Sequence, residues 1–114
     1  MKVIIAGSRN ITDYDAIKNI IEQSQFEITE VVSGMARGID SLAVRYTQEN
    51  NIPLKEFPAD WNKHGKSAGP IRNTEMANYA DALIAIWDGR SRGTKHMIDI
   101  STKRGLQVEV FYYD

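Results

Sequence analysis

Ser33-Gly-Met-Ala-Arg-Gly-Ile-Asp40 joins a segment typical of a buried strand to a segment typical of a helix. The β-branched run 28–32 precedes it, and apolar residues with helical spacing follow it, at Ile39, Leu42, Ala43 and Tyr46. A strand that turns into a helix through two glycines leaves unpaired backbone N–H groups at the helix start. With the helix dipole, these groups favour an anion, most often a phosphate. The stretch therefore predicts a β–α turn with an anion site.

Four residues of this turn have expected roles. Gly34 allows the tight turn, and Gly38 allows close approach of a ligand or of the neighbouring strand. Ser33 supplies a hydroxyl and Arg37 a guanidinium. The alternative is an ordinary β–α turn in which the glycines only satisfy the backbone geometry.

The composition is that of one soluble globular domain over residues 1–114, with 42% apolar and 25% charged residues. The chain has no cysteine and only two histidines, which excludes disulfides and argues against a structural metal site. No apolar run approaches the roughly 20 residues that cross a bilayer, and nothing resembles a signal peptide, so we expect a cytoplasmic protein. A net charge of −1 argues against a surface that coats nucleic acid.

Five apolar runs alternate with helical patterns along the chain. The predicted strands cover residues 2–6, 28–32, 54–57, 82–87 and 106–112. This alternation predicts a three-layer α/β/α domain with a five-stranded, mainly parallel sheet. If the order is 3-2-1-4-5, as we expect, it reverses between the first and fourth strands. Ligands bind to such sheets beyond the carboxyl ends of the strands, where the strand order reverses.

Helix boundaries follow from capping and proline signals. Thr12 is the expected cap of the first helix, and Asn51 is near the expected end of the second. Pro70 suits the first position of a helix, so residues 58–69 are expected to form one long irregular segment. Loops of this length in small domains are usually functional or disordered, and Trp61 in the middle argues against disorder.

Arginines gather in the predicted turns after the strands. Four of the seven lie in turns 7–10, 33–40 and 88–94, and a fifth opens the helix after the long segment: Arg9, Arg37, Arg90, Arg92 and Arg72. Arginine forks suit phosphate oxygens, so this distribution favours an anionic, phosphate-bearing small ligand. The alternative is a solvated basic rim.

Several motifs resemble, in order, the SLOG superfamily of Rossmann-like domains. They are Gly7-Ser-Arg9, the turn 33–40 (similar to the SGxAxGID turn of DNA-processing protein A), Gly69-Pro-Ile-Arg-Asn73 and Ser91-Arg-Gly-Thr94. Phe57-Pro-Ala-Asp-Trp61 and Lys63-His-Gly-Lys66 look most like the small stand-alone YspA-type branch. The resemblance covers nearly the whole chain and implies a nucleotide or nucleotide-derived ligand. With the predicted turns it implies these ligand-binding residues: Gly7, Ser8, Arg9, Ser33, Gly34, Arg37, Gly38, Asp40, Trp61, Arg72, Asn73, Asp88, Ser91, Arg92, Gly93 and Thr94.

One SLOG branch, the "lonely guy" phosphoribohydrolases, cleaves the N-glycosidic bond of nucleoside monophosphates. Its signature is Gly-Gly-x-Gly-Thr-x-x-Glu. Residues 90–97 keep Gly93-Thr94, but Met97 stands where the glutamate would be. A methionine can neither stabilise an oxocarbenium ion nor activate water, so that mechanism needs another carboxylate here.

Three carboxylates are candidates for that role. Asp40, Glu75 and Asp88 lie near the predicted site, and each also has a structural alternative. Asp40 is a favourable charge in the first turn of a helix, Glu75 an exposed helix residue, and Asp88 a turn-former. The catalytic residues therefore stay unknown. We identify no cofactor, although a Mg²⁺ ion held by ligand phosphates and one carboxylate would leave no motif.

Aromatic residues and histidines allow several interpretations. Trp61 either stacks on a base or fixes its loop to the domain by burying its ring. His64 lies between Lys63 and Lys66, and the three side chains could together contact phosphates. His96 is expected to be structural or exposed. Tyr112 and Tyr113 are expected to cover a subunit interface, because relatives of this type often form homo-oligomers.

Three functions remain in competition. The leading one is binding of a phosphorylated nucleotide-derived small molecule, a nucleoside phosphate or an ADP-ribose-like compound, by a sensor, carrier or sequestering protein. The second is an N-glycosidic hydrolase or transferase acting on the same compounds. The third, from the DNA-processing relatives, is binding of single-stranded DNA, which the acidic charge balance disfavours.

Overall fold

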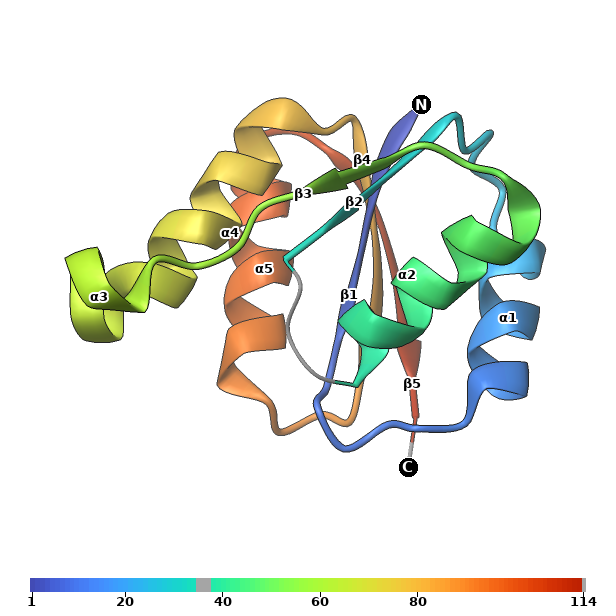
Figure 1. Cartoon of the computed structure of the whole chain (residues 1–114), viewed down its shortest axis with the longest axis horizontal. Helices are drawn as coiled ribbons and strands as arrows, with labels where there is room; N and C mark the ends of the chain where they lie inside the picture. The colour runs from blue at the N-terminus through green and yellow to red at the C-terminus, as the bar shows by residue number, and fades with distance from the viewer. Residues whose placement is uncertain (35–37, 114) are drawn as a thin grey trace.

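The computed structural model describes residues 1–34 and 38–113, in which strands and helices alternate (Figure 1). In chain order the elements are β1 (Lys2–Gly7), α1 (Tyr14–Gln23), β2 (Glu30–Ser33), α2 (Ile39–Asn50), β3 (Leu54–Glu56), α3 (Trp61–His64), the 3₁₀ turn η1 (Gly65–Ser67), α4 (Ala68–Tyr79), β4 (Ala82–Trp87), α5 (Arg92–Lys103) and β5 (Gln107–Tyr112). The five predicted strands are all present, with ends that differ by up to two residues from the prediction.

The sheet has the order β3-β2-β1-β4-β5, and every neighbouring pair is parallel. Val3 of β1 lies beside Val31 of β2 on one side and Ala82 of β4 on the other. This confirms the predicted Rossmann-like sheet and its order.

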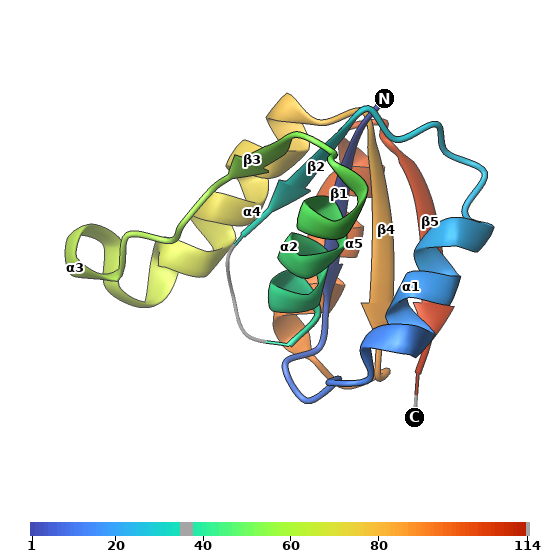
Figure 2. The same cartoon turned by 45° about the vertical axis from the view of Figure 1, so that its right-hand side comes forward.

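Helices cover both faces of the sheet, which is why its central strands are almost wholly apolar (Figures 1 and 2). Val3 and Ile5 belong to a core under α1 and α2, together with Ile17 and Ile39. The alternate residues of β1, such as Ile4, belong to a second core under α4 and α5. All of these strand residues are fully buried.

The path of the chain reverses between β1 and β4. From β1 it passes to α1 on one face, whereas from β4 it passes to α5 on the other face (Figure 2). The loops after these two strands therefore diverge, and a crevice is expected between them. The site is expected in this crevice.

Two glycines are required here by close approach. A Cβ on Gly7 would lie 2.4 Å from the carbonyl oxygen of Ile86 and 2.5 Å from Cγ1 of Ile39. Gly38 has a φ of +72°, and a Cβ there would lie 2.5 Å from the backbone oxygen of Arg9. The predicted close approach of a neighbouring strand at Gly38 is thus an approach of the segment that follows β1.

Capping differs from prediction in the first helix. Asp13, not Thr12, is the N-cap of α1, and its Oδ1 accepts a hydrogen bond from the Ala16 backbone N–H at 3.2 Å. Asn51 ends α2 in the left-handed conformation, with a φ of +53°, so the predicted stop is confirmed within one residue.

The prediction of one long irregular segment over 58–69 was wrong. Asp60 caps the short helix α3 by accepting from the Lys63 N–H at 3.0 Å, and η1 leads directly into α4 at Ala68. Pro70 is the third residue of α4 rather than its first, a position whose N–H needs no partner within the helix. α3 projects away from the sheet beyond the start of α4 (Figures 1 and 2).

Within residues 1–34 and 38–113, no helix combines the length and the apolar character needed to span a bilayer.

Gly7→Ala is expected to lower the free energy of unfolding by about 1–3 kcal/mol, because the new Cβ overpacks against Ile86 and Ile39. Urea denaturation measures the loss. Gly69→Ala is the control, since its Cβ meets nothing nearer than 3.7 Å and alanine is favoured in a helix. A Gly7→Ala protein as stable as the wild type would contradict the close packing described for this strand end.

Candidate functional site

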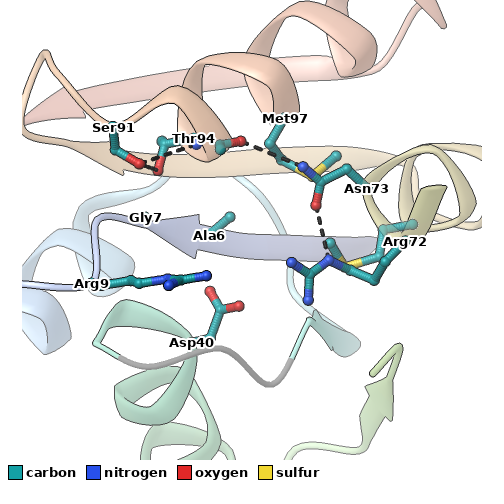
Figure 3. Close-up of a pocket in the computed structure, with 11 residues that line it drawn as sticks. Ala6, Gly7, Arg9, Asp40, Arg72, Asn73, Ser91, Thr94 and Met97 are labelled. Atoms are coloured by element: carbon teal, nitrogen blue, oxygen red, sulfur yellow. Dashed lines mark hydrogen bonds between the residues drawn. The ribbon is translucent and has the colours of Figure 1, made fainter. Parts of the chain in front are cut away.

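A pocket lies at the carboxyl end of β1, between the starts of α2 and α5 and the middle of α4 (Figure 3). It therefore occupies the crevice where the strand order reverses. The residues that line it are Ala6, Gly7, Arg9, Asp40, Arg72, Asn73, Met76, Ser91, Gly93, Thr94 and Met97.

Arg72, in the second turn of α4, is the most constrained charge of the pocket. Its Nη1 donates to the carbonyl oxygen of Gly34 at 2.6 Å, and its Nε donates to Oδ1 of Asn73 at 3.0 Å. Burial is the main cause that lowers the pKa of Arg72; the Asp40 carboxylate acts to raise this pKa and the Arg9 guanidinium to lower it. The guanidinium nonetheless stays charged, because arginine does not deprotonate in proteins.

The position of Arg72 requires a glycine at residue 34. A Cβ at this position would lie 2.5 Å from Nη1 of Arg72. The sequence predicted that a glycine is needed here for a tight turn. The structure adds that a side chain at this position would clash with the Arg72 guanidinium from α4. The carbonyl that accepts from Arg72 and the missing side chain belong to the same residue.

Asp40 and Arg9 face each other across the mouth of the pocket (Figure 3). Asp40 is in the first turn of α2 and is 6% exposed. Arg9 follows β1 and is exposed. The carboxylate of Asp40 also acts on Arg72, so it lies in the field of two cations. The pocket therefore combines two positive side chains with one negative side chain.

The start of α5 forms another wall of the pocket. Ser91 is the N-cap: its Oγ accepts from the Thr94 N–H at 3.4 Å and from the Thr94 hydroxyl at 3.1 Å. Nothing lies within 4 Å of a Cβ built on Gly93, so the backbone of this first turn is open on that side. The positive end of the α5 dipole adds to the field of the arginines.

A family model described as "YspA, cpYpsA-related SLOG family" matches residues 1–64. The chain is also 38% identical over 117 residues to the Gene 61 protein of Mycobacterium phage D29, with 94% of this chain and 93% of that protein covered. This chain belongs to the YspA-related SLOG family.

The fold of this SLOG domain is also that of a solved structure. The domain matches DNA processing protein A (DprA) of Streptococcus pneumoniae with a TM-score of 0.80 and 19% sequence identity. The match covers 99% of this chain and 50% of the other, so this chain spans about half the length of that protein. At this identity the match shows a shared fold.

Half of the sixteen predicted ligand-binding residues meet in one place. Eight of them line the pocket: Gly7, Arg9, Asp40, Arg72, Asn73, Ser91, Gly93 and Thr94. Gly34 and Gly38 lie behind this lining, where they make room for Arg72 and for the backbone of Arg9. Arg37 lies outside the described residues.

Ser8 and Asp88 have structural partners instead of a place in the lining. Ser8 is 1% exposed, its N–H donates to the Ile86 carbonyl, and its Oγ accepts from the Asp88 N–H at 3.1 Å. Oδ1 of Asp88 accepts from the backbone N–H groups of Arg90 and Ser91, both at 2.8 Å. Asp88 thus forms the turn before α5, which was the alternative interpretation of this residue.

The remaining predicted residues also lie outside the lining. Trp61 is on α3 with 54% of its surface exposed, and its ring lies over Gly69 at the start of α4. Arg92 and Glu75 are exposed, whereas Ser33 is fully buried at the end of β2. Of the three candidate carboxylates, Asp40 alone is among the lining residues.

One feature of the site was missed from the sequence, and His96 agrees with its structural interpretation. Ala6, Met76 and Met97 supply an apolar part of the lining, for which the sequence signal was Met97 at the position of the glutamate in the "lonely guy" signature. His96 is half-buried, and its Nδ1 lies 3.1 Å from Nδ2 of Asn73. Among the residues described, no group of three or more His, Cys, Asp or Glu side chains is arranged to hold a metal ion.

Asp88→Ala is expected to lower stability at pH 7, and this deficit should shrink as the solution is acidified. The backbone N–H groups of Ser91 and Arg90 hold the pKa of Asp88 below its usual value. The ionised carboxylate therefore stabilises the fold above its unfolded pKa of about 3.9, and this contribution is lost as the pH falls through the lower folded value.

Urea denaturation of both proteins at pH 7 and near pH 3 measures this change. Glu75→Gln, an exposed carboxylate on α4, is the control and should leave stability nearly unchanged at pH 7. A deficit of Asp88→Ala that is equal at both pH values would contradict the role of the ionised carboxylate.

Proposed function

We propose that this SLOG protein binds a phosphorylated, nucleotide-derived small molecule in the pocket, and that it acts as a sensor, carrier or sequestering protein. The proposed ligand is a nucleoside phosphate or an ADP-ribose-like compound. The observation that carries the proposal is the convergence of Arg9, Arg72 and the start of α5 on one pocket.

Charge and geometry support a phosphate-bearing ligand. Arg9 offers an exposed fork, and Arg72 is a partly desolvated cation, whose attraction to an anion is stronger than in bulk water. Backbone N–H groups in the first turn of a helix add donors that suit phosphate oxygens. Gly93 lines the pocket and has no side chain that would cover these groups.

The rest of the lining supports a ligand that is more than a phosphate. Ala6, Met76 and Met97 give the pocket an apolar side, suited to a sugar or base face. The Asp40 carboxylate on the opposite wall is an acceptor of the kind that binds ribose hydroxyls. Apolar surface, one carboxylate and two cations together match the parts of a nucleotide.

A second candidate function rests on the position of Asp40. It is the one candidate carboxylate in the described lining, so it is the residue we assign to hydrolysis if the protein is an enzyme. Water would add its oxygen to C1′ of the ribose, the N-glycosidic bond would break, and a proton would pass to the leaving base. A carboxylate beside C1′ stabilises the oxocarbenium-like transition state or activates the water.

Native mass spectrometry of the freshly purified protein, followed by denaturation, identifies any molecule that it retains. An intact nucleotide derivative supports the binding function, whereas a free base with a ribose phosphate supports hydrolysis. For protein without a retained molecule, calorimetric titration with ADP-ribose, AMP, inorganic phosphate and oligothymidylate separates the classes. Binding of oligothymidylate alone would favour the third candidate, single-stranded DNA, and would overturn the proposal.

Arg9→Gln is expected to weaken binding of the best compound in that panel by about 1–3 kcal/mol, because a charge-assisted contact to phosphate is lost. Calorimetry measures the dissociation constant. Arg90→Gln is the matched control, an exposed arginine in the neighbouring turn that does not line the pocket. Equal affinities of the wild type and a folded Arg9→Gln protein would remove Arg9 from the proposed site.

Asp40→Asn tests the second candidate function. If the protein hydrolyses AMP, the release of adenine measured by chromatography should fall about a hundredfold or more, which is the usual loss for a group that transfers protons. Glu75→Gln should keep the wild-type rate. Tight binding of AMP by the wild type without any release of adenine would refute hydrolysis of this substrate.

A further inference from the structure

A chain of hydrogen bonds connects three elements behind the pocket. The Gly34 carbonyl after β2 accepts from Nη1 of Arg72 at 2.6 Å, and Nε of Arg72 donates to Oδ1 of Asn73 at 3.0 Å. Nδ2 of Asn73 then lies 3.1 Å from Nδ1 of His96 on α5. The chain thus runs from the end of β2 through α4 to α5.

The orientation of the Asn73 amide follows from two partners whose roles cannot change. Nε of Arg72 can only donate, so it must face the amide oxygen. The carbonyl oxygen of Gly93 can only accept, and it lies 3.4 Å from the amide nitrogen. Asn73 is 7% exposed, so water is largely kept from replacing either partner.

This orientation determines the state of His96. Because the amide nitrogen of Asn73 is a donor, Nδ1 of His96 must accept, and an accepting imidazole nitrogen carries no proton. His96 is therefore neutral in this arrangement, with its proton on Nε2. The histidine is not among the residues that line the pocket.

We propose that neutral His96 is a positioning residue that holds the Asn73 amide, and through it the Arg72 guanidinium, in place at the pocket. Protonation of Nδ1 sets two donors face to face. If the amide turns over to accept from His96, its nitrogen faces Nε of Arg72 and the same conflict arises there. If the amide stays, it loses the acceptor that holds it at His96; if it turns over, Arg72 loses its Asn73 partner, and its guanidinium is freed to move.

Charged groups on every element packed against α5 bear on this titration. On α4 they are Arg72 and the exposed Glu75; on α5 they are Arg92, the pair Lys95–Asp99, at 2.8 Å, and Lys103 in the last turn. Arg104, just after α5, donates to Asn78. On the strands they are Lys2, at the opposite end of the sheet, and Glu109, which accepts from Ser24 after α1.

Nuclear magnetic resonance tests the arrangement without any ligand. In ¹⁵N-labelled protein, long-range ¹H–¹⁵N spectra are expected to give Nδ1 of His96 unprotonated and Nε2 protonated at pH 8. The Nε–Hε signal of Arg72 should shift as His96 is titrated with acid. A proton on Nδ1 of His96 at pH 8 would overturn the proposal. So would an Arg72 Nε–Hε signal whose position stays the same while His96 is titrated.

His96→Asn is the conservative variant. The asparagine Oδ1 is as many bonds from the backbone as Nδ1 of histidine, and it accepts without titrating. The Arg72 signal should therefore keep its pH 8 position in this variant throughout the acid range. His64→Asn is the matched control, because His64 is the other histidine of the chain and lies on α3; it should leave the wild-type shift intact.

Asn73→Asp reverses the requirement on His96. A carboxylate still accepts from Nε of Arg72, but it has no donor to offer the histidine, so Nδ1 of His96 must now carry a proton. The same spectra should report protonated Nδ1 at pH 8. An unprotonated Nδ1 in a folded Asn73→Asp protein would overturn the proposal.

The consequence for binding rests on the proposed function and is tested separately. ADP-ribose is the probe, because its pyrophosphate bridge does not titrate between pH 8 and 5. Its affinity for the wild type should fall about fivefold as His96 protonates, stay level in His96→Asn, and be low at every pH in His96→Leu. An equal pH dependence in the wild type and His96→Asn would overturn the effect on binding. No binding at any pH, with the expected spectra, would instead count against the proposed ligand.

Discussion

The reversal of the chain path between β1 and β4 is the constraint on which the rest of the structure depends. A parallel sheet covered on both faces must send successive crossovers to one face or the other, and a crevice opens where the direction changes. In this protein the change occurs where Gly7 lies beside Ile86, with no room for a side chain on the glycine. The starts of α2 and α5 and the middle of α4 therefore meet around one pocket.

Neutral groups orient the buried cation of this crevice, in addition to the charges near it. Arg72 is bonded to a backbone carbonyl and to an amide, and the nearby Asp40 offsets part of the cost of burying the guanidinium. Such an arrangement keeps a cation oriented before any ligand arrives, so less ordering is needed on binding. The same arrangement makes the position of the cation depend on neutral partners such as Asn73.

Local signals predicted the fold well but misassigned several individual residues. Alternating apolar runs and glycine-rich turns are sufficient to predict five strands of a parallel sheet, because burial on both faces demands such runs. The helix starts predicted from Thr12 and Pro70 were wrong because neighbouring residues take those roles. Asp13 is the N-cap of α1, and α4 begins two residues before Pro70. Trp61 was expected over the site, whereas α3 takes it to the exposed start of α4.

The sequence by itself determined the number of strands, their parallel arrangement and the family, since each depends on patterns within short stretches or on motifs in a given order. Only the tertiary structure decided which polar side chains meet. Residues 34, 72 and 96 are far apart in the chain, and the packing of α4 against α5 brings them into one hydrogen-bond chain. The packing of α2 against β1 left Asp40 in the pocket lining, while local turn geometry gave Asp88 its backbone partners. Contacts of this kind depend on distances between elements, which periodicity and motif spacing do not contain.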